Sequence, residues 1–286
     1  MTDRASSILV FGHTGQVATE LARQAPGATF LGRADADLTD PAACVAAIQA
    51  HGPRVVINAA AYTAVDKAEE DEATAYLVNA AAPGAMARAC ADLGIPFLHV
   101  STDYVFEGGG ETPWSEDDPV GPLGAYGRTK LAGEEAVRDA GGTHVILRTS
   151  WVFSAHGANF VKTMLRLSET RDALNVVADQ IGGPTPAADI AATLLTLATR
   201  LQEGAEGGTY HYGGAPAVSW HGFACETFRR AGREVAVTGI PTREFPTPAT
   251  RPLNSRMDGA KLLHDHGIAP PDWQAGLDAV LAELSG

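Results

Sequence analysis

The segment Ile8-Leu9-Val10-Phe11-Gly12-His13-Thr14-Gly15-Gln16-Val17-Ala18 decides the fold. It opens with a short apolar run of strand-forming residues, and a helical pattern follows the glycines. A strand, a glycine-rich turn and a helix in this order place backbone N–H groups where they can hold a pyrophosphate. Gly12 would permit the tight turn, Gly15 the close approach of a ligand, and Ala18 close packing of helix on strand. An ordinary βα turn is the alternative, which the well-placed strand makes the weaker interpretation.

A second strand is predicted over residues 28–32, and the side chains at its end bear on the choice of a dinucleotide. An acidic residue there would bind an adenosine ribose hydroxyl, whereas an arginine would accommodate a 2′-phosphate. Arg33 lies at this end, and Asp35 and Asp37 follow it. The mixture leaves NAD and NADP both open and leans toward NADP. The alternative for Arg33 is an ordinary solvent-exposed charge in the loop.

Further apolar runs alternate with helical patterns along the first half of the chain. The predicted strands cover residues 55–58, 97–100 and 145–148. Small or polar residues follow them, namely Ala59-Ala60-Ala61, Ser101-Thr102-Asp103 and Thr149-Ser150-Trp151. This βαβα alternation predicts an α/β fold with a Rossmann-like, doubly wound parallel sheet. Ligands of such sheets bind at the carboxyl ends of the strands.

The alternation loosens after Trp151, and this change suggests two domains. We expect residues 1–150 to form an NAD(P)-binding Rossmann domain that segments near 174–212 complete. Residues 151–173 and 213–286 are expected to form a smaller, mostly helical C-terminal substrate-binding domain. In the first domain a long helix is predicted over about residues 73–93, with a kink at Pro83 and Gly84.

Tyr126 and Lys130 are four residues apart in a predicted helix, which places them on one face. A free phenol is a poor proton donor near neutral pH, since its reference pKa is about 10. A nearby ammonium favours the phenolate and lowers that pKa. The pair is therefore a candidate general acid/base. A surface helix with a lysine that reaches into solvent is the alternative.

Composition limits the classes of partner. The chain has 286 residues, of which 45% are apolar, and a net charge of −13, which argues against nucleic acid or an acidic membrane surface. Cys44, Cys90 and Cys225 show no metal-binding spacing and suggest reduced thiols in a cytoplasmic protein. No stretch is long enough for a membrane span, and the first apolar run is too brief for a signal peptide. No metal site is predicted.

Five motifs together resemble the extended short-chain dehydrogenase/reductase superfamily and, within it, the dTDP-4-dehydrorhamnose reductase family. The resemblance covers nearly the whole chain. The motifs are Gly12-His13-Thr14-Gly15-Gln16-Val17, Asn58-Ala59-Ala60-Ala61-Tyr62-Thr63-Ala64-Val65-Asp66, Ser101-Thr102-Asp103-Tyr104-Val105-Phe106, Tyr126-Gly127-Arg128-Thr129-Lys130-Leu131-Ala132-Gly133-Glu134 and Arg251-Pro252-Leu253-Asn254-Ser255-Arg256. The first and fourth occur across the superfamily, whereas the third and last are closer to the reductases.

The resemblance implies reduction of the C4 ketone of a dTDP-sugar by NADPH, with NADH as the other candidate cofactor. The catalytic residues would be Thr102, Tyr126 and Lys130. The cofactor would contact residues of four segments, namely Gly12, Gly15, Gln16, Val17, Arg33, Asp37, Leu38, Ala61, Tyr62, Thr63, Tyr126 and Lys130. The substrate would contact Thr102, Asp103, Trp151, Arg251 and Asn254, with Arg251 on its diphosphate. A structural salt bridge is the alternative for Arg251.

Two departures from the family pattern affect packing and metal binding. Ala18 replaces a third glycine, which should alter packing more than chemistry. Some family members bind magnesium between subunits through glutamates. Glu20 matches one such position, but Ala188 stands where another is expected. This argues against a magnesium-linked dimer and leaves a homodimer without metal open.

Four other functions share parts of this pattern. The first is a ketoreductase that acts on another nucleotide sugar. Nucleotide-sugar 4,6-dehydratases need an Asp-Glu pair after the catalytic threonine, whereas here Asp103 is followed by Tyr104. A nucleotide-sugar epimerase needs only the three catalytic residues and a bound cofactor. A non-catalytic regulatory subunit would bind NADP and a partner enzyme, and the intact catalytic residues argue against it.

Overall fold

The computed structural model describes residues 8–286, and its centre is a six-stranded parallel sheet in the order β10-β5-β4-β3-β1-β2. The strands are β1 (Ile8–Phe11), β2 (Thr29–Leu31), β3 (Val55–Asn58), β4 (Phe97–Thr102), β5 (His144–Thr149) and β10 (Gly208–His211). The chain turns in opposite directions on the two sides of β1, since β2 flanks one edge and β3 the other. This confirms the predicted doubly wound fold. Open sheets of this type bind ligands at that switch point.

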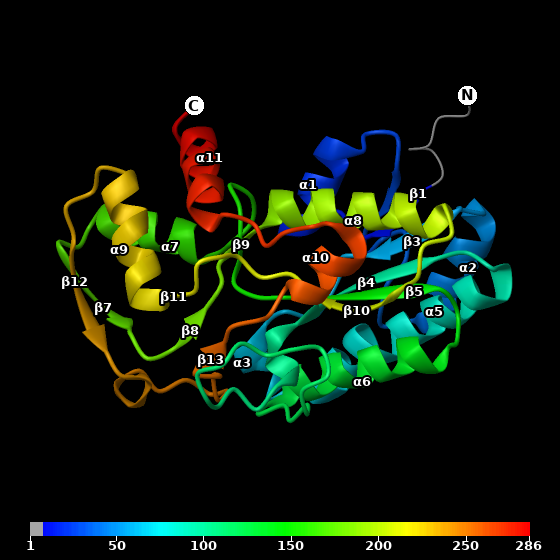
Figure 1. Ribbon diagram of the computed structural model, residues 1–286, viewed down its shortest axis with the longest axis horizontal. Helices are drawn as coiled ribbons and strands as arrows, with labels where there is room; N and C mark the ends of the chain where they lie inside the picture. The colour runs from blue at the N-terminus through cyan, green and yellow to red at the C-terminus, as the bar shows by residue number, and fades with distance from the viewer. Residues whose placement is uncertain (1–7) are drawn as a thin grey trace.

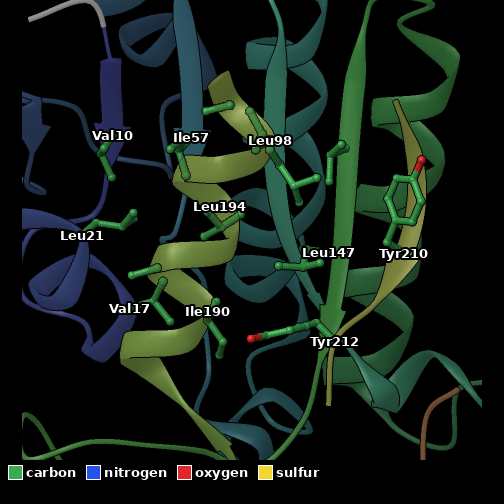
Figure 2. Close-up of a cluster of buried hydrophobic side chains, with 14 of the residues drawn as sticks. Val10, Val17, Leu21, Ile57, Leu98, Leu147, Ile190, Leu194, Tyr210 and Tyr212 are labelled. Carbon is green, nitrogen blue, oxygen red and sulfur yellow. The ribbon is translucent and has the colours of Figure 1, made fainter. Parts of the chain in front are cut away.

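Helices cover both faces of the large sheet (Figure 1). One face carries α1 (Gln16–Gln24) and α8 (Ala187–Gln202). The other carries α2 (Pro41–His51), α5 (Ala82–Leu93) and α6 (Ala125–Asp139). Figure 2 shows the first face, where Ile190 and Leu194 of α8 pack over side chains of the strands. Because both faces of the sheet are buried, the strands are continuous apolar runs in the sequence and do not alternate between apolar and polar residues.

The start of α2 and the region before α5 follow from local chemistry. Asp40 caps α2 by accepting from Ala42 N and Ala43 N, as the Asp-Pro pair predicts. The predicted long helix is divided into α4 (Glu72–Tyr76), a π-helical segment (Leu77–Ala81) and α5. The interruption therefore lies before Pro83 rather than at it. Pro83 has no N–H to donate to Asn79 O, and that oxygen approaches Gly133 of α6 too closely for any side chain there.

The later part of the chain builds three small sheets and several helices. β7 (Ala173–Val177) pairs with β12 (Ala236–Ile240), and β6 (Val152–Phe153) with β9 (Thr185–Pro186). β8 (Ile181–Gly182) lies between β11 (Val218–Ser219) and β13 (Asn254–Ser255). The remaining elements are α3 (Val65–Ala68), α7 (Phe160–Ser168), α9 (Trp220–Arg230), α10 (Ala260–His266), α11 (Trp273–Ser285) and the 3-10 turns Asp103–Val105 and Thr242–Glu244.

Two of these placements differ from the expected domain division. β10 joins the large sheet as expected of the segments near 174–212, but β7 pairs only with β12, outside that sheet. α10 was expected in the substrate-binding domain, yet its Leu262 is buried in the core of the large sheet. Strand and helix patterns report local structure, whereas the choice of packing partner depends on distant residues.

Two observations concern the cysteine thiols and the possibility of a membrane-spanning helix. Cys44, Cys90 and Cys225 form no disulfide, and burial raises the pKa of the first two thiols to about 11 and 12. Among residues 8–286, no helix is both long and apolar enough to cross a membrane.

Candidate active site

The glycine-rich turn leads from β1 into α1 at the switch point of the sheet. Gly12 has a φ of 121°, and a side chain there would meet Ala18 Cβ at 3.3 Å and the backbone of Ala59 and Ala60 at 3.4 Å. Gly15 precedes α1 and no side chain caps its first N–H groups, while the space beside its Cα is open. Unpaired N–H groups with room beside them suit a dinucleotide pyrophosphate.

Gln16 uses its side chain to join the two parts of the molecule. Its amide donates to Val152 O at 3.3 Å, and its Oε1 accepts from Ser154 and from Asn159, each at 2.9 Å. The Gln16 side chain is therefore largely occupied by contacts within the protein, whereas its backbone N–H at the start of α1 has no side-chain cap.

The end of β2 carries the charged residues that bear on cofactor choice. Asp37 Oδ1 accepts from Thr39 N, and hydrogen bonds from Thr39 lower the pKa of this carboxyl. Asp35 Oδ2 accepts from Gly32 N. The Arg33 side chain is 77% exposed, with Nε 3.6 Å from Asp37 Oδ2. Both acids thus have local structural partners, whereas the exposed guanidinium of Arg33 has donors beyond its ion pair with Asp37 that can reach a phosphate.

The segment after β3 is held by Asn79 of the π-helical segment, a contact that the sequence did not indicate. Asn79 Oδ1 accepts from Tyr62 N at 2.8 Å, and its amide donates to Tyr62 O and to Thr129 Oγ1. These bonds fix Tyr62 beside Ala61 and Thr63 at the carboxyl edge of the sheet.

Thr102 and Tyr126 lie together where β4 ends and α6 begins. Burial raises the pKa of Tyr126 to about 12, the neighbouring Thr102 hydroxyl opposes this rise by favouring the phenolate, and the Asp103 charge adds to it. The N-terminus of α6 is fixed by Glu69, whose Oε1 accepts from Ala125 N at 2.9 Å. Tyr126 therefore carries its proton at neutral pH and is available as an acid.

Comparisons with known proteins agree with this geometry. A family model described as the RmlD substrate binding domain matches residues 6–285. A dTDP-4-dehydrorhamnose reductase of Sinorhizobium fredii is 44% identical over 277 residues, covering 93% of this chain and 94% of the relative. The structure of a dTDP-4-dehydrorhamnose reductase from Clostridium acetobutylicum has a TM-score of 0.92 at 38% identity and covers 98% of this chain and 99% of its own. That of Bacillus anthracis, solved in complex with NADP, has a TM-score of 0.90 at 33% identity, with 96% and 98% covered.

The chain belongs to the dTDP-4-dehydrorhamnose reductase family. The resemblance found in its motifs is thereby confirmed, and the chain spans nearly the full length of these relatives.

The Lys130 side chain is held by β4. Its amino group is buried, with Nζ 2.7 Å from Val100 O and 3.1 Å from His99 Nε2. Burial lowers the pKa of Lys130 to about 8, and the Glu134 charge opposes this shift. Burial raises the pKa of Tyr126 in this structure, and the expected action of Lys130 on Tyr126 stays a prediction.

Asp103 is buried beside the hydroxyl groups of the site. Burial raises its pKa to about 6, and the neighbouring hydroxyl groups of Ser255 and Thr102 oppose this rise. Thr102 Oγ1 donates to Asp103 Oδ1 at 3.1 Å, whereas Asp103 Oδ2 is buried without a partner among the described residues. An unpaired buried oxygen beside Thr102 fits a hydroxyl of a sugar ligand.

Arg251 and Asn254 were both expected at the substrate, and their surroundings differ. Arg251 Nη2 pairs with Asp66 Oδ2 at 2.7 Å, while Nη1 is buried without a partner among residues 8–286. Asn254 is 1% exposed, and its amide donates to Gly109 O and Thr112 O. The Asn254 side chain thus holds the loop before α6, and its contact with substrate stays a prediction.

Trp151 takes a backbone conformation that is rare for a tryptophan, with a φ of 49°. Its ring stacks on Trp220 of α9, with centroids 3.5 Å apart and planes at 10°. Gly182 also lies against the ring, and a side chain at Gly182 would meet Trp151 Cε2 at 2.8 Å. Strain of this kind persists where neighbouring structure enforces it, often at ligand sites. Trp220 was missed because only the fold brings it to Trp151.

Glu20 matches a position that binds magnesium in some family members, so its neighbours show whether the ion fits here. Within the described part of the chain, Glu20, His156 and Glu283 form the one group with metal-ligand spacing. Arg23 Nη1 lies 3.2 Å from Glu20 Oε1, 2.9 Å from Glu283 Oε2 and 3.1 Å from His156 Nε2. A single guanidinium already pairs with both carboxylates, and magnesium prefers oxygen ligands to imidazole. These residues do not fit a magnesium ion, and Ala188 supplies no ligand.

Proposed function

We propose that the chain reduces the C4 ketone of dTDP-4-dehydro-6-deoxy-L-mannose, that is dTDP-4-dehydrorhamnose, to dTDP-L-rhamnose with NADPH. The observation that carries this is the position of Thr102 at the carboxyl end of β4 next to protonated Tyr126, on the same edge of the sheet as the glycine-rich turn after β1. The names of the family members and the NADP bound to one of them support the same reaction. This places the chain in nucleotide-sugar and cell-surface polysaccharide biosynthesis.

The chemistry assigns one role to each side chain. The reduced nicotinamide supplies the hydride when it is bound. Tyr126 donates its proton to the oxygen on which negative charge grows, which is where a positioned donor accelerates reaction most. Thr102 is a second donor once its hydroxyl turns from Asp103 to the substrate. Lys130 bonds the nicotinamide ribose, and Trp151 and Asp103 contact the sugar.

The domain roles follow from this assignment. The large sheet with residues 1–150, α8 and β10 would bind the cofactor, through the backbone of Gly15, Gln16 and Val17 and the segment around Tyr62. Residues 151–173 and most of 213–286 would cover the sugar nucleotide. The unpaired cysteines support a cytoplasmic location, and a homodimer is compatible with the chain.

An assay of cofactor oxidation tests the proposed reaction. NADPH absorbance should fall when the 4-keto sugar nucleotide is added, and dTDP-L-rhamnose should form in equal amount. An epimerase or a regulatory subunit would consume no NADPH. Absence of net consumption with intact cofactor binding would therefore overturn the proposed function.

Arg33→Ala should raise the KM for NADPH and leave the KM for NADH nearly unchanged. The reason is that the exposed Arg33 guanidinium is the cation at the end of β2 that can meet a 2′-phosphate. Steady-state kinetics with both cofactors measure this, with Arg171→Ala as a control at a distant exposed arginine. Equal changes for the two cofactors would exclude the 2′-phosphate contact.

Arg251→Ala should raise the KM for the sugar nucleotide by about 10- to 100-fold, as expected for loss of hydrogen bonds to a charged group. The buried, unpaired Nη1 provides the contact to the diphosphate. NADPH affinity should not change. Asp66→Asn is the matched control, because it weakens the ion pair and keeps the guanidinium. If Asp66→Asn reproduces the loss, Arg251 acts through its salt bridge instead.

A further inference from the structure

Three buried side chains form a chain of hydrogen bonds beneath the catalytic residues. Asn58 ends β3, His99 lies in β4 and Lys130 in α6, and none is more than 1% exposed. His99 Nδ1 lies 3.1 Å from Asn58 Nδ2, and His99 Nε2 lies 3.1 Å from Lys130 Nζ. The proposed reaction assigns no role to Asn58 or His99.

The orientation of the Asn58 amide follows from its other neighbour. Ala60 N–H donates to Asn58 at 3.1 Å, so the atom that faces Ala60 must be the oxygen. The amide nitrogen of Asn58 then faces His99. Since this nitrogen can only donate, His99 Nδ1 must accept and carry no hydrogen. Neutral His99 therefore carries its proton on Nε2.

This tautomer determines what His99 presents to Lys130. The Nε2–H group points at Lys130 Nζ, and an ammonium has three donors and no acceptor. Two donors would then face each other in a buried place. A neutral amine resolves the conflict, because its lone pair accepts from His99 while one of its hydrogens goes to Val100 O at 2.7 Å.

We propose that Asn58 and His99 are positioning residues that fix the direction of the hydrogen bond at Lys130 and thereby set the pH at which Lys130 loses its charge. The pair holds a proton donor against Lys130, which disfavours the ammonium. The inference rests on the proposed role of Lys130 in hydride transfer, and it adds the two residues that control this role.

The other charged groups near Lys130 agree with this assignment. Burial lowers the pKa of Lys130 to about 8, and Glu134 on the same helix opposes the shift. Arg148 of β5 is bound to Glu134 and offsets its charge. On β4, burial and then the charge of Lys130 keep the pKa of His99 well below its usual value, so His99 stays neutral. In the turn after β4, the Asp103 charge raises the pKa of Tyr126, and Tyr126 in turn raises the pKa of Tyr104.

The tautomer can be read directly in the full-length protein, with and without NADPH. Nitrogen-15 NMR of histidine distinguishes the two ring nitrogens, and the His99 signals are assigned by difference from His99→Phe. We expect the hydrogen on Nε2. A hydrogen on Nδ1 in the wild-type protein would overturn the proposal, whether or not the protein turns over a dTDP-sugar.

Asn58→Asp reverses the direction of the hydrogen bonds with almost no change of shape. The carboxylate accepts from both Ala60 N–H and His99 Nδ1–H, so His99 Nε2 becomes an acceptor that favours the ammonium. Hydride transfer should be lost on the alkaline side as Lys130 deprotonates. In Asn58→Asp this limb should move to higher pH by about one unit or more, since a charge-assisted hydrogen bond replaces a donor conflict.

The carboxylate of Asn58→Asp could also act on Lys130 through its charge alone, and a double variant separates the two effects. In Asn58→Asp combined with His99→Phe no ring nitrogen connects the positions. We expect the shift of the single-turnover pH profile to disappear, relative to His99→Phe alone. An equal shift in both backgrounds, or none in Asn58→Asp, would overturn the proposal. A protein without NADPH consumption at any pH would instead contradict the proposed function.

Discussion

Tyr126→Phe should slow hydride transfer by at least 10², within the range of about 10² to 10⁴ typical of general acid catalysis. The substitution keeps the ring, and with it the edge contact to Tyr104 at 5.4 Å between centroids, but removes the proton. Fold and NADPH binding should therefore survive. The measurement is single-turnover hydride transfer at saturating NADPH and substrate.

The matched control is Tyr104→Phe, which removes a phenol hydroxyl from the neighbouring ring and should cost far less. A rate for Tyr126→Phe within a factor of a few of wild type would exclude Tyr126 as the acid. The role would then move to Asp103 or a bound water. The pKa of Asp103, raised to about 6 by burial, makes it the nearest alternative proton carrier.

Lys130→Met extends this test to the helper of Tyr126. It should slow turnover and also weaken NADPH binding, because the ammonium is expected both to bond the nicotinamide ribose and to favour the phenolate of Tyr126. Combined with Tyr126→Phe, the total loss should be much smaller than the product of the two single losses, since residues that act as a unit are non-additive. Fully multiplicative losses would show that the two side chains work independently.

Arg148→Met should lower the free energy of unfolding by about 3–5 kcal/mol, the range for breaking a buried ion pair from one side. Arg148 is 3% exposed and donates Nε and Nη2 to the two oxygens of fully buried Glu134, at 2.9 and 2.7 Å. Ser101 donates to the same carboxylate at 2.6 Å. Methionine leaves the Glu134 charge buried with too few partners. Urea unfolding at neutral pH measures the loss.

The pH dependence of this loss has a definite sign. Burial raises the pKa of Glu134, but the hydrogen bond and charge of Arg148 outweigh it, so the pKa in the folded protein lies below normal. Its stabilisation is thus present above the unfolded pKa and is lost as pH falls through the folded value. In Arg148→Met the pKa of Glu134 should rise, so the gap to wild type should narrow at about pH 5.

Arg138→Met provides the control for Arg148→Met. Arg138 Nη1 meets the same carboxylate at 3.2 Å, but its side chain is 38% exposed. A solvent-exposed partner contributes up to about 1 kcal/mol. Equal losses for the two variants would contradict the view that burial gives the Arg148–Glu134 pair its importance.

The parts of the site that sequence reasoning found are those encoded within one short segment. The turn from Gly12 to Gly15 needs only local backbone geometry, and the spacing of Tyr126 and Lys130 needs only a helical period. Asn58, which orients His99, opens one of the five family motifs, yet the motif does not show what the Asn58 side chain contacts. In the sequence, His99 is one more residue of a buried strand.

The sequence by itself determined the doubly wound sheet, the family and the segments that carry the chemistry, because strand and helix periods and glycine turns are local properties. The tertiary structure alone decided that β7 pairs with β12, that the Asn254 side chain hydrogen-bonds to the loop before α6, and that Lys130 contacts His99. Each of these depends on contacts between segments far apart in the chain. A side chain's protonation and partners follow from what burial brings beside it, and no local pattern records that.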